Sequence, residues 1–516
     1  MKSESQRVIK KFRDHSTHCV ELFRTELINI LENFNVYDGL DVDLRTDIFN
    51  NILLECYNKC CPIRSKILSR SKLFRPWFDH DLKVLCDMKH NLYKQYRRGI
   101  VNCNSYKIFN SDFKNLVKRS KLNYFRNKFQ SCSNEIKKTW KTINDFIGCK
   151  RRRSLSEIIK EGVSYSSDSD IANCFNSFFG SIASNLRNNI PNTNRSPLSY
   201  MGNREISSIQ YHPTSAAEVE VILDKLKITK GNIYSVPVFI LKKVTGAISP
   251  ILSALFNSSI NESLFPSLFK TATVTPVHKT GSYNDVKMYR PISILPTLSK
   301  VFERLIYNRL LLFFNDNNTL NKHQFGFRKG LCTIDAVTEL LESYYDSLNS
   351  GKFHVSVFLD LSKAFDTLDH GILISKLDHV GIRGNILRWL NSYLSGRQQC
   401  VSVNSKISSM CHILSGVPQG SILGPLLFLI YINDMAKSAP TLHCVHFADD
   451  STVSVSGEDI YDIFDILNNE LSNIRVWIQT NKLSLNAAKT TYMVITNKCF
   501  PENLQLKIGD SILNRV

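Results

Sequence analysis

The sequence has no long hydrophobic run, no paired-cysteine motif and no excess of acidic residues, and each absence excludes a class of protein. The longest apolar stretch, 424–432, is far too short to cross a membrane as a helix. The N-terminus begins with charged and polar residues, so we expect no secretory signal. The 14 cysteines lack Cys-x-x-Cys spacing, which favours reduced thiols in an intracellular protein over a disulfide framework or a zinc site.

Basic residues, in contrast, are abundant and unevenly placed. The 516 residues include 65 Lys and Arg against 46 Asp and Glu, a formal charge of +19. Residues 51–160 alone hold 26 basic and 8 acidic side chains, which is a net charge of +18. A segment of this kind is typical of a surface that faces a polyanion, here joined to a nearly neutral globular body.

The pattern of apolar residues predicts a helical N-terminal part followed by a mixed body. From about residue 79 to 150, basic helix faces alternate with aromatic residues, which either stack on exposed bases or form the core between the helices. A polar stretch at 188–207 marks a boundary. Helical patterns beyond residue 214 then alternate with short β-rich runs, which predicts a sheet with helices packed on it. These runs are 272–277, 354–359, 399–403, 442–447 and 452–455.

Acidic residues stand at the ends of two apolar strands. Asp360 follows one strand, and Asp449 and Asp450 join two others. An isolated Asp-Asp pair is more often a solvated turn, but pairing of these strands in one sheet would gather three carboxylates around one point. Hard oxygen ligands of this kind suit two Mg²⁺ or Mn²⁺ ions, which promote in-line displacement of pyrophosphate by a hydroxyl group.

Six motifs occur in a specific order from residue 289 onward. They are 289–295 (YRPISIL), 323–328 (HQFGFR), 360–366 (DLSKAFD), 415–425 (SGVPQGSILGP), 447–450 (FADD) and parts of 477–490. Together they resemble the reverse transcriptase of non-long-terminal-repeat retrotransposons, the LINE group and in particular its jockey-like branch. The resemblance covers about residues 209–516.

The resemblance implies an RNA-directed DNA polymerase, a nucleotidyltransferase that extends a DNA 3′-OH with dNTPs on an RNA template by two-metal phosphoryl transfer. It assigns catalysis and binding of two Mg²⁺ (or Mn²⁺) ions to Asp360, Asp449 and Asp450. For the nucleotide it implies a triphosphate contact, a ring that rejects the ribose 2′-OH, a pocket floor of two residues and a lysine at the β/γ-phosphates. These residues are, in that order, Arg290, Phe365, Gln419, Gly420 and Lys489.

Template phosphates are implied to contact Arg328 and Lys329. The implied fold is α+β, a right-hand polymerase whose palm and fingers combine an antiparallel-rich sheet with packed helices. We expect fingers at 209–350, a palm at 351–516 and a linker at 191–208, preceded at 1–190 by a mostly α-helical, basic N-terminal region.

Two family features are expected to be missing, namely a thumb after the palm and an endonuclease before the polymerase. The expected partners are an RNA template, a DNA primer and dNTPs, with no membrane. They would meet in a ribonucleoprotein of the nucleus and cytoplasm that serves transposition. The alternative hypothesis is a catalytically silent, truncated remnant that binds RNA. Incorporation that an Asp449→Asn substitution abolishes would distinguish the two.

Overall fold

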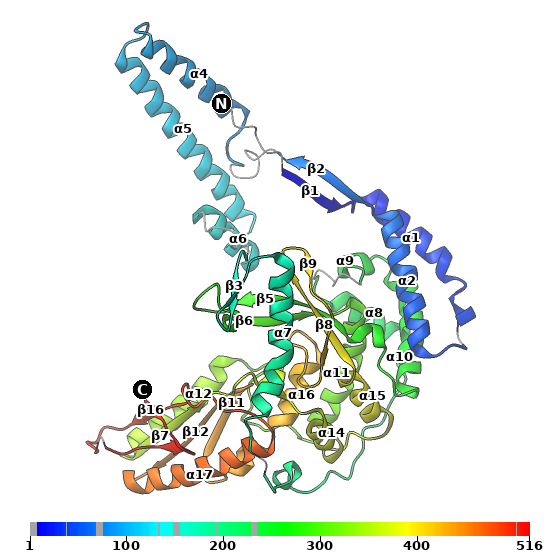
Figure 1. Cartoon of the computed structure of the whole chain (residues 1–516), viewed down its shortest axis with the longest axis vertical. Coiled ribbons are helices and arrows are strands. Elements are labelled where there is room, and N and C mark those ends of the chain that lie inside the picture. The colour runs from blue at the N-terminus through cyan, green and yellow to red at the C-terminus, as the bar shows by residue number, and fades with distance from the viewer. Residues whose placement is uncertain are drawn as a thin grey trace. The chain divides into compact units, whose positions relative to one another are not determined.

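A computed structural model describes residues 8–37, 39–68, 76–132, 135–147, 155–191, 193–228, 235–501 and 503–516 (Figure 1). The chain forms two compact units. The first comprises Met1–Ser16 and Cys61–Ser154, and the second comprises Thr17–Cys60 and Leu155–Val516. No helix in the described ranges is long and apolar enough to span a membrane. Every cysteine that the structure describes is a free thiol.

The first unit contains a short ribbon and a long helical hairpin. Strand β1 (Val8–Arg13) pairs antiparallel with β2 (Ile63–Leu68). Helices α4 (His80–Arg97) and α5 (Cys103–Gln130) lie side by side and are followed by α6 (Ile136–Ile147) (Figure 1). Asp79 and Asn102 cap α4 and α5, because each side chain accepts a hydrogen bond from a backbone N–H of the first turn.

Aromatic residues of the first unit pack on one another between its helices. Tyr96 of α4 stacks on Tyr106 of α5 with ring centroids 5.8 Å apart, and Phe125 meets Phe146 of α6 edge-on at 5.0 Å. These contacts favour the interpretation that the rings form the core of the hairpin. The cations, in contrast, remain on its surface. Exposed basic residues of α5 without an ion-pair partner in the described chain are Lys107, Lys114, Lys118, Arg119 and Arg126.

The second unit is built around two sheets. One has the order β10-β8-β5-β6, with β9 beside β8. Its strands are β5 (Thr271–His278), β6 (Tyr289–Ile294), β8 (Arg397–Val403), β9 (Lys406–Ile407) and β10 (Cys411–Ile413). The other, which we call the palm sheet, has the order β11-β12-β7-β13-β16. Its strands are β7 (Phe353–Leu359), β11 (His443–Phe447), β12 (Asp450–Gly457), β13 (Thr491–Ile495) and β16 (Asn514–Arg515).

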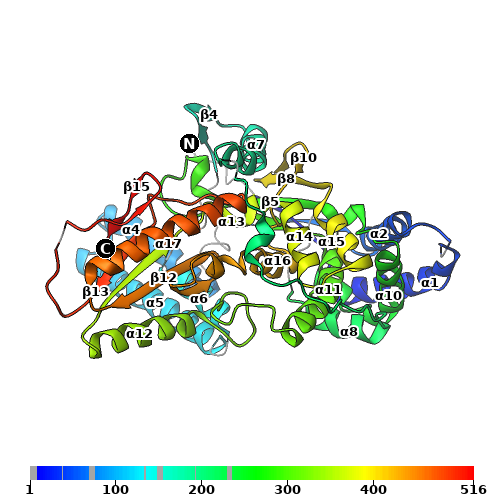
Figure 2. The ribbon, with the colours of Figure 1, turned by 90° about the horizontal axis from the view of Figure 1, so that it is seen from below.

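Two short ribbons and many helices complete this unit. The ribbons pair β3 (Ile158–Lys160) with β4 (Val163–Tyr165) and β14 (Lys507–Ile508) with β15 (Ser511–Ile512). The described helices are α1 (Thr17–Leu31), α2 (Val42–Cys60), α7 (Asp168–Arg187), α8 (Ala216–Lys225), α9 (Val238–Leu241), α10 (Thr245–Asn261), α11 (Thr297–Asp316), α12 (Thr333–Asn349), α13 (Ala364–Thr367), α14 (His370–His379), α15 (Gly384–Leu394), α16 (Leu423–Ile432) and α17 (Ile460–Thr480). Figure 2 shows α12 on one face of the palm sheet and α17 on the other.

The division into units differs from the expected boundary near residues 191–208. Helix α2 packs on α10, where the backbone N–H of Val42 donates to Glu262 Oε2 at 3.1 Å. Helix α7 packs on β8 and buries Phe175, whose ring meets Tyr289 of β6 at 4.9 Å. Both helices therefore belong to the second unit, because their apolar faces are buried against it.

The α+β fold class predicted from the sequence is confirmed. All five β-rich runs named above form strands, as β5, β7, β8, β11 and β12. Pairing is mainly antiparallel, and parallel pairs join β5 to β8 and β13 to β16. Every strand pair among β7, β11, β12 and β13 is antiparallel, so the two acidic motifs are carried by one continuous sheet.

Candidate active site

Strand pairing in the palm sheet brings the two acidic motifs together. Strand β7 lies between β12 and β13, and its last residue, Leu359, pairs with Ser451 of β12. Asp360 therefore leaves β7 at the end of the sheet where β12 begins at Asp450. This is the pairing that three carboxylates around one point require.

Asp449 lies in a tight turn at the same end of the sheet. Phe447 of β11 pairs with Asp450 of β12, which leaves Ala448 and Asp449 as the two turn residues. Ala448 has a φ of 58°, in the left-handed region that costs a non-glycine residue about 1–3 kcal/mol. Asp449 is half-buried and Asp450 is exposed. The turn is thus a strained backbone that the surrounding structure must hold in place.

The charge around Asp449 fits a divalent cation. Burial raises the pKa of the Asp449 carboxyl group, and the neighbouring carboxylates of Asp450 and Asp360 raise it further, whereas Arg290 opposes them. The oxygens of the three carboxylates do not all lie within 4.8 Å of one another, so a cation bound between them would draw these side chains together and relieve their repulsion. The donor set consists of carboxylate oxygens alone, and this is the chemistry that Mg²⁺ or Mn²⁺ prefers.

Asn486, which the sequence analysis did not single out, orients Asp360. Its side-chain Nδ2 donates to Asp360 Oδ2 at 2.8 Å, and its backbone N–H donates to the Asp360 carbonyl at 2.8 Å. The Asp360 backbone N–H in turn approaches Thr490 Oγ1 at 3.4 Å. The segment before β13 therefore fixes the first carboxylate through both its side chain and its backbone.

Several cations lie close to one another, and one of them, Arg290, also acts on Asp449. Lys363 follows Asp360 closely, with its pKa lowered mainly by burial, while Asp366 opposes this shift and Lys279, Arg290 and Lys489 add to it. Arg290 of β6 and Lys489 are exposed, and neither has a hydrogen-bond or ion-pair partner for its side chain among the described residues. The sequence analysis assigned no role to Lys363 or Lys279, because no local pattern identifies a lysine whose charged neighbours come from distant segments.

Phe365 lies beside this group of charges in a fixed orientation. Its half-buried ring stacks on Phe428 of α16 with centroids 4.3 Å apart and meets the exposed Phe327 edge-on at 5.9 Å. Rotation of the Phe365 side chain would break the stack. The stack on Phe428 therefore holds the Phe365 ring in one orientation.

Gln419 and Gly420 join this region to β6. The Gln419 carbonyl accepts a hydrogen bond from Ser293 N at 2.8 Å, and its Nε2 donates to Asp366 Oδ1 at 2.8 Å. Gly420 has a φ of 126°, and a Cβ there would lie 2.5 Å from the Ser293 carbonyl oxygen. Glycine is required at this position by backbone conformation and by close approach to β6.

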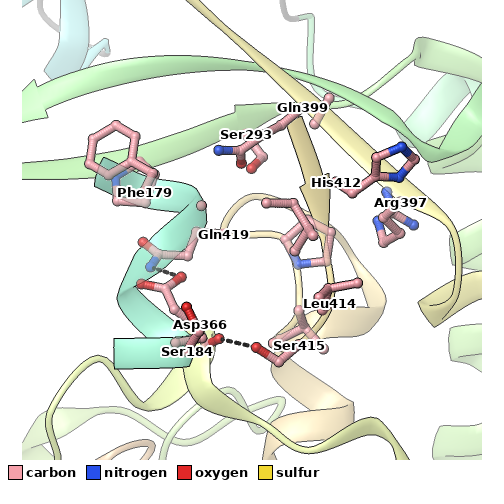
Figure 3. A pocket seen from close by; sticks show the side chains of 18 of the residues that line it. Phe179, Ser184, Ser293, Asp366, Arg397, Gln399, His412, Leu414, Ser415 and Gln419 are labelled. Carbon is pink, nitrogen blue, oxygen red and sulfur yellow. Dashed lines mark hydrogen bonds between the residues drawn. The ribbon is translucent and has the colours of Figure 1, made fainter. Parts of the chain in front are cut away.

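Gln419 and Asp366 also line a cavity of about 330 Å³ (Figure 3). Figure 3 shows Phe179 and Ser184 of α7 on one side and Arg397 and His412 on the other. Burial raises the pKa of Asp366, and Gln419 partly offsets this by donating to the carboxylate. Asp360, Asp449 and Asp450 do not line this cavity.

The 323–328 motif holds the turn that carries Asp449. Gln324 Oε1 accepts hydrogen bonds from Gly326 N at 2.8 Å and from Ala448 N at 2.9 Å. A Cβ on Gly326 would lie 2.2 Å from the Ala448 nitrogen, so only glycine allows this approach. Arg328 donates to the Asn321 carbonyl at 3.1 Å, and Lys329 is exposed. The sequence analysis missed Gln324 because its partner is 124 residues away.

Part of the chain is similar to a known protein family. Residues 277–507 match the family described as "Reverse transcriptase (RNA-dependent DNA polymerase)". The part of the chain that is similar to this family contains the acidic motifs, Arg290, Phe365 and Lys489. The resemblance stated from the six motifs is confirmed at the level of this family.

Similar curated proteins include RNA-directed DNA polymerases from a transposon and from a mobile element. The probable RNA-directed DNA polymerase from transposon X-element of Drosophila melanogaster is 32% identical over 252 residues, which is 48% of this chain and 28% of the relative. The RNA-directed DNA polymerase from mobile element jockey of the same organism is 32% identical over 255 residues, with the same shares. The chain thus matches 28% of the length of these two relatives.

Among solved structures, apo telomerase from Candida tropicalis, truncated from its C-terminal domain, has a TM-score of 0.34 and 12% sequence identity. The match covers 53% of this chain and 66% of that chain. A likeness of this size carries no argument about the fold.

Proposed function

We propose that this chain is an RNA-directed DNA polymerase that extends a DNA 3′-OH with dNTPs on an RNA template. The observation that carries the proposal is the pairing of β7 with β12, which brings Asp360 beside Asp449 and Asp450. Carboxylates next to a group of cations suit phosphoryl transfer, in which catalysis is mostly positioning and charge stabilisation. The reverse transcriptase match over 277–507 supports the same reaction.

Asp360 and Asp449 would hold two Mg²⁺ (or Mn²⁺) ions, with Asp450 beside them. Bound there, such ions activate the attacking 3′-hydroxyl and stabilise the charge of the leaving pyrophosphate. Asn486 keeps the Asp360 carboxylate in one orientation through its 2.8 Å hydrogen bond. The strained backbone of Ala448 fixes the turn that holds Asp449 near Asp360.

The remaining residues bind and select the nucleotide. The Arg290 guanidinium offers paired donors to phosphate oxygens, and Lys489 and Lys363 supply further positive charge for the β- and γ-phosphates. Lys489, which is exposed, would also donate a proton to the leaving pyrophosphate. The Phe365 ring, fixed by its stack on Phe428, excludes a ribose 2′-OH. Gln419 and Gly420, which contact the backbone of Ser293, form the floor of the proposed nucleotide pocket.

Each of the two units has a basic surface that binds RNA. Exposed cations of α5 in the first unit contact backbone phosphates, as do Arg328 and Lys329 in the second. Within the second unit we assign residues 209–350 to the fingers and 351–516 to the palm. The relatives from transposon X-element and mobile element jockey support a role in copying element RNA. We assign this activity to a ribonucleoprotein of the nucleus and cytoplasm.

Primer extension tests this proposal. Purified protein is mixed with a poly(rA)/oligo(dT) duplex, Mg²⁺ and dTTP, and wild type is compared with Asp449→Asn and with Asp465→Asn as a matched control. Asp465 is exposed on α17 and has no part in the site. We expect extension by wild type and the control, and a loss of several orders of magnitude in Asp449→Asn.

RNA binding by the same proteins is measured by fluorescence anisotropy. Equal affinity in all three proteins shows that the lost extension is a loss of chemistry. Wild-type protein that binds RNA tightly but extends no primer would overturn the proposal in favour of a silent RNA-binding protein.

A further inference from the structure

A second group of metal-binding side chain types lies between α12 and the palm sheet. His323 Nδ1 and His443 Nε2 lie 2.5 and 2.9 Å from the same atom, Oε1 of Glu339 on α12. Among the residues that the structure describes, only these three bring such ligand atoms within 4.8 Å of one another. His443 begins β11, at the opposite end of that strand from the Ala448–Asp449 turn.

We propose that His323, Glu339 and His443 bind a Zn²⁺ ion. Two imidazole nitrogens and one carboxylate oxygen are a ligand set that zinc accepts, with a fourth position left for water. Bonds of about 2.0–2.1 Å in a tetrahedral arrangement place ligand atoms about 3.3 Å apart. The two nitrogen–oxygen distances, 2.5 and 2.9 Å, would have to lengthen by less than 1 Å to reach that spacing. The inference does not depend on polymerase activity.

Ions can enter this site from solvent. The side chains of His323, Glu339 and His443 are 31%, 24% and 35% exposed. The site is therefore open to an ion from solvent.

The packing around the cluster gives such an ion a structural role. His354, Ser356 and Ser454 share the face of the sheet that lies against α12, since Ser454 pairs with both His443 and Ser356. His354 Nε2 and Ser454 Oγ are buried without a hydrogen-bond partner. Helix α12 also contacts this face through Ser347 Oγ, 2.9 Å from His354 Nδ1, and a metal ion would add a second polar link between the helix and the sheet.

The same ion would act on the loop that holds the active-site turn. His446 N donates to the His323 carbonyl at 2.9 Å, and Phe325 N donates to the His446 carbonyl at 2.8 Å. These bonds align the 323–326 loop with β11, up to the contact of Gln324 with Ala448. A zinc ion on His323 and His443 would fasten that loop to the start of the same strand.

Metal binding tests the proposal directly. Tag-free, chelator-treated full-length protein is titrated with ZnCl₂ under reducing conditions, and bound zinc is measured by calorimetry and elemental analysis. The variants are Glu339→Gln, which keeps an oxygen acceptor for both imidazoles, and His443→Ala. Glu342→Gln is the matched control, because Glu342 is exposed on the same helix. Excess Mg²⁺ is present throughout, since a hard cation does not compete for imidazole ligands.

We expect wild type and Glu342→Gln each to bind one zinc equivalent that His443→Ala does not bind. Glu339→Gln should bind this equivalent with an affinity more than tenfold lower than that of wild type. Zinc should raise the melting temperature of wild type and of the control, but not that of His443→Ala. Co²⁺ in place of Zn²⁺ should give the visible absorption of tetrahedral nitrogen and oxygen ligation, without a thiolate charge-transfer band. Equal stoichiometry and affinity in all four proteins would overturn the proposal, as would a thiolate band, which would assign the zinc to cysteines.

Discussion

The side-chain carbonyl of Gln324 accepts a hydrogen bond from the backbone N–H of Ala448 at 2.9 Å. This single contact joins the 323–328 motif to the turn that carries Asp449. The same oxygen also accepts from Gly326 N, so one side chain fixes both the loop and the turn. The family resemblance associates the 323–328 motif with template binding. The contact shows that this motif also supports the strained turn that carries Asp449.

The first prediction concerns Gln324. Gln324→Met keeps the side-chain length but removes both hydrogen bonds, leaving two backbone donors unpaired. We expect the free energy of unfolding to fall by about 1–3 kcal/mol, and dTTP incorporation to fall about 100-fold as Asp449 shifts. Chemical denaturation and single-turnover extension measure the two effects. Gln505→Met, at an exposed position, should change neither. An active-site role for this contact is refuted by unchanged incorporation in Gln324→Met.

The second prediction concerns Gly326. A Cβ at this position would lie 2.2 Å from the Ala448 nitrogen, and that backbone atom cannot move without moving the turn. Gly326→Ala should therefore lose incorporation at least as severely as Gln324→Met. Gly246→Ala is the matched control, because a Cβ there meets no atom within 4 Å and Ala favours a helix. Full activity in Gly326→Ala would show that the turn tolerates displacement.

The third prediction concerns sugar selection by Phe365. Phe365→Val shortens the wall beside the proposed nucleotide site, so rUTP incorporation should rise relative to dTTP by at least tenfold. Competing single-nucleotide extension with both substrates measures this ratio. Phe464→Val serves as a control, since Phe464 belongs to the core between α17 and β13 and contacts Tyr492. An unchanged ratio in Phe365→Val would remove the steric argument.

The fourth prediction concerns the basic surface of α5. RNA affinity of the full chain should fall steeply as salt rises, because bound cations displace condensed counterions. Replacing Lys118 and Arg119 with Gln should lower the slope of log K against log salt by about 0.7 for each phosphate that is no longer neutralised. Fluorescence anisotropy over a salt series gives the slopes. The control pair, Lys406→Gln with Lys507→Gln, is exposed on the other unit and should keep the wild-type slope. A flat response in wild type would contradict the proposed RNA surface.

The fifth prediction concerns stability in acid. Burial lowers the pKa of both His354 and His446 from 6.5 to about 4. Each imidazole binds its proton more readily in the unfolded chain, so the stabilisation is complete above pH 6.5 and is lost as the pH falls toward 4. Each histidine should reduce the free energy of unfolding by about 1.4 kcal/mol per pH unit in that range.

Urea unfolding at pH 7, 6 and 5 measures this slope. In His354→Gln the pH slope of the unfolding free energy should be smaller by the contribution of one proton, about 1.4 kcal/mol per pH unit. His18→Gln, at an exposed position, should retain the wild-type slope. Identical slopes in wild type and His354→Gln would show that His354 is protonated in the folded protein.

Much of the palm and the acidic site could be predicted from the sequence, because both depend on local signals. Apolar β-rich runs mark the strands, and the motifs place Asp360, Asp449 and Asp450 at strand ends. The contacts that support the site could not be predicted in this way. Asn486 meets Asp360, and Gln324 meets Ala448, through pairings of distant segments whose register no local periodicity encodes. The same holds for Glu339, whose two histidine partners come from a loop and a strand.

The central position of β7 has a consequence for synthesis of the protein. Its two neighbours, β12 and β13, both follow it in the chain, so β7 leaves the ribosome long before either partner exists. Until then its apolar residues, including Val355 and Val357, are exposed along two open edges. Long-range pairing of this kind is slow to form and prone to aggregation. The nascent chain should therefore depend on chaperones until translation has passed residue 495.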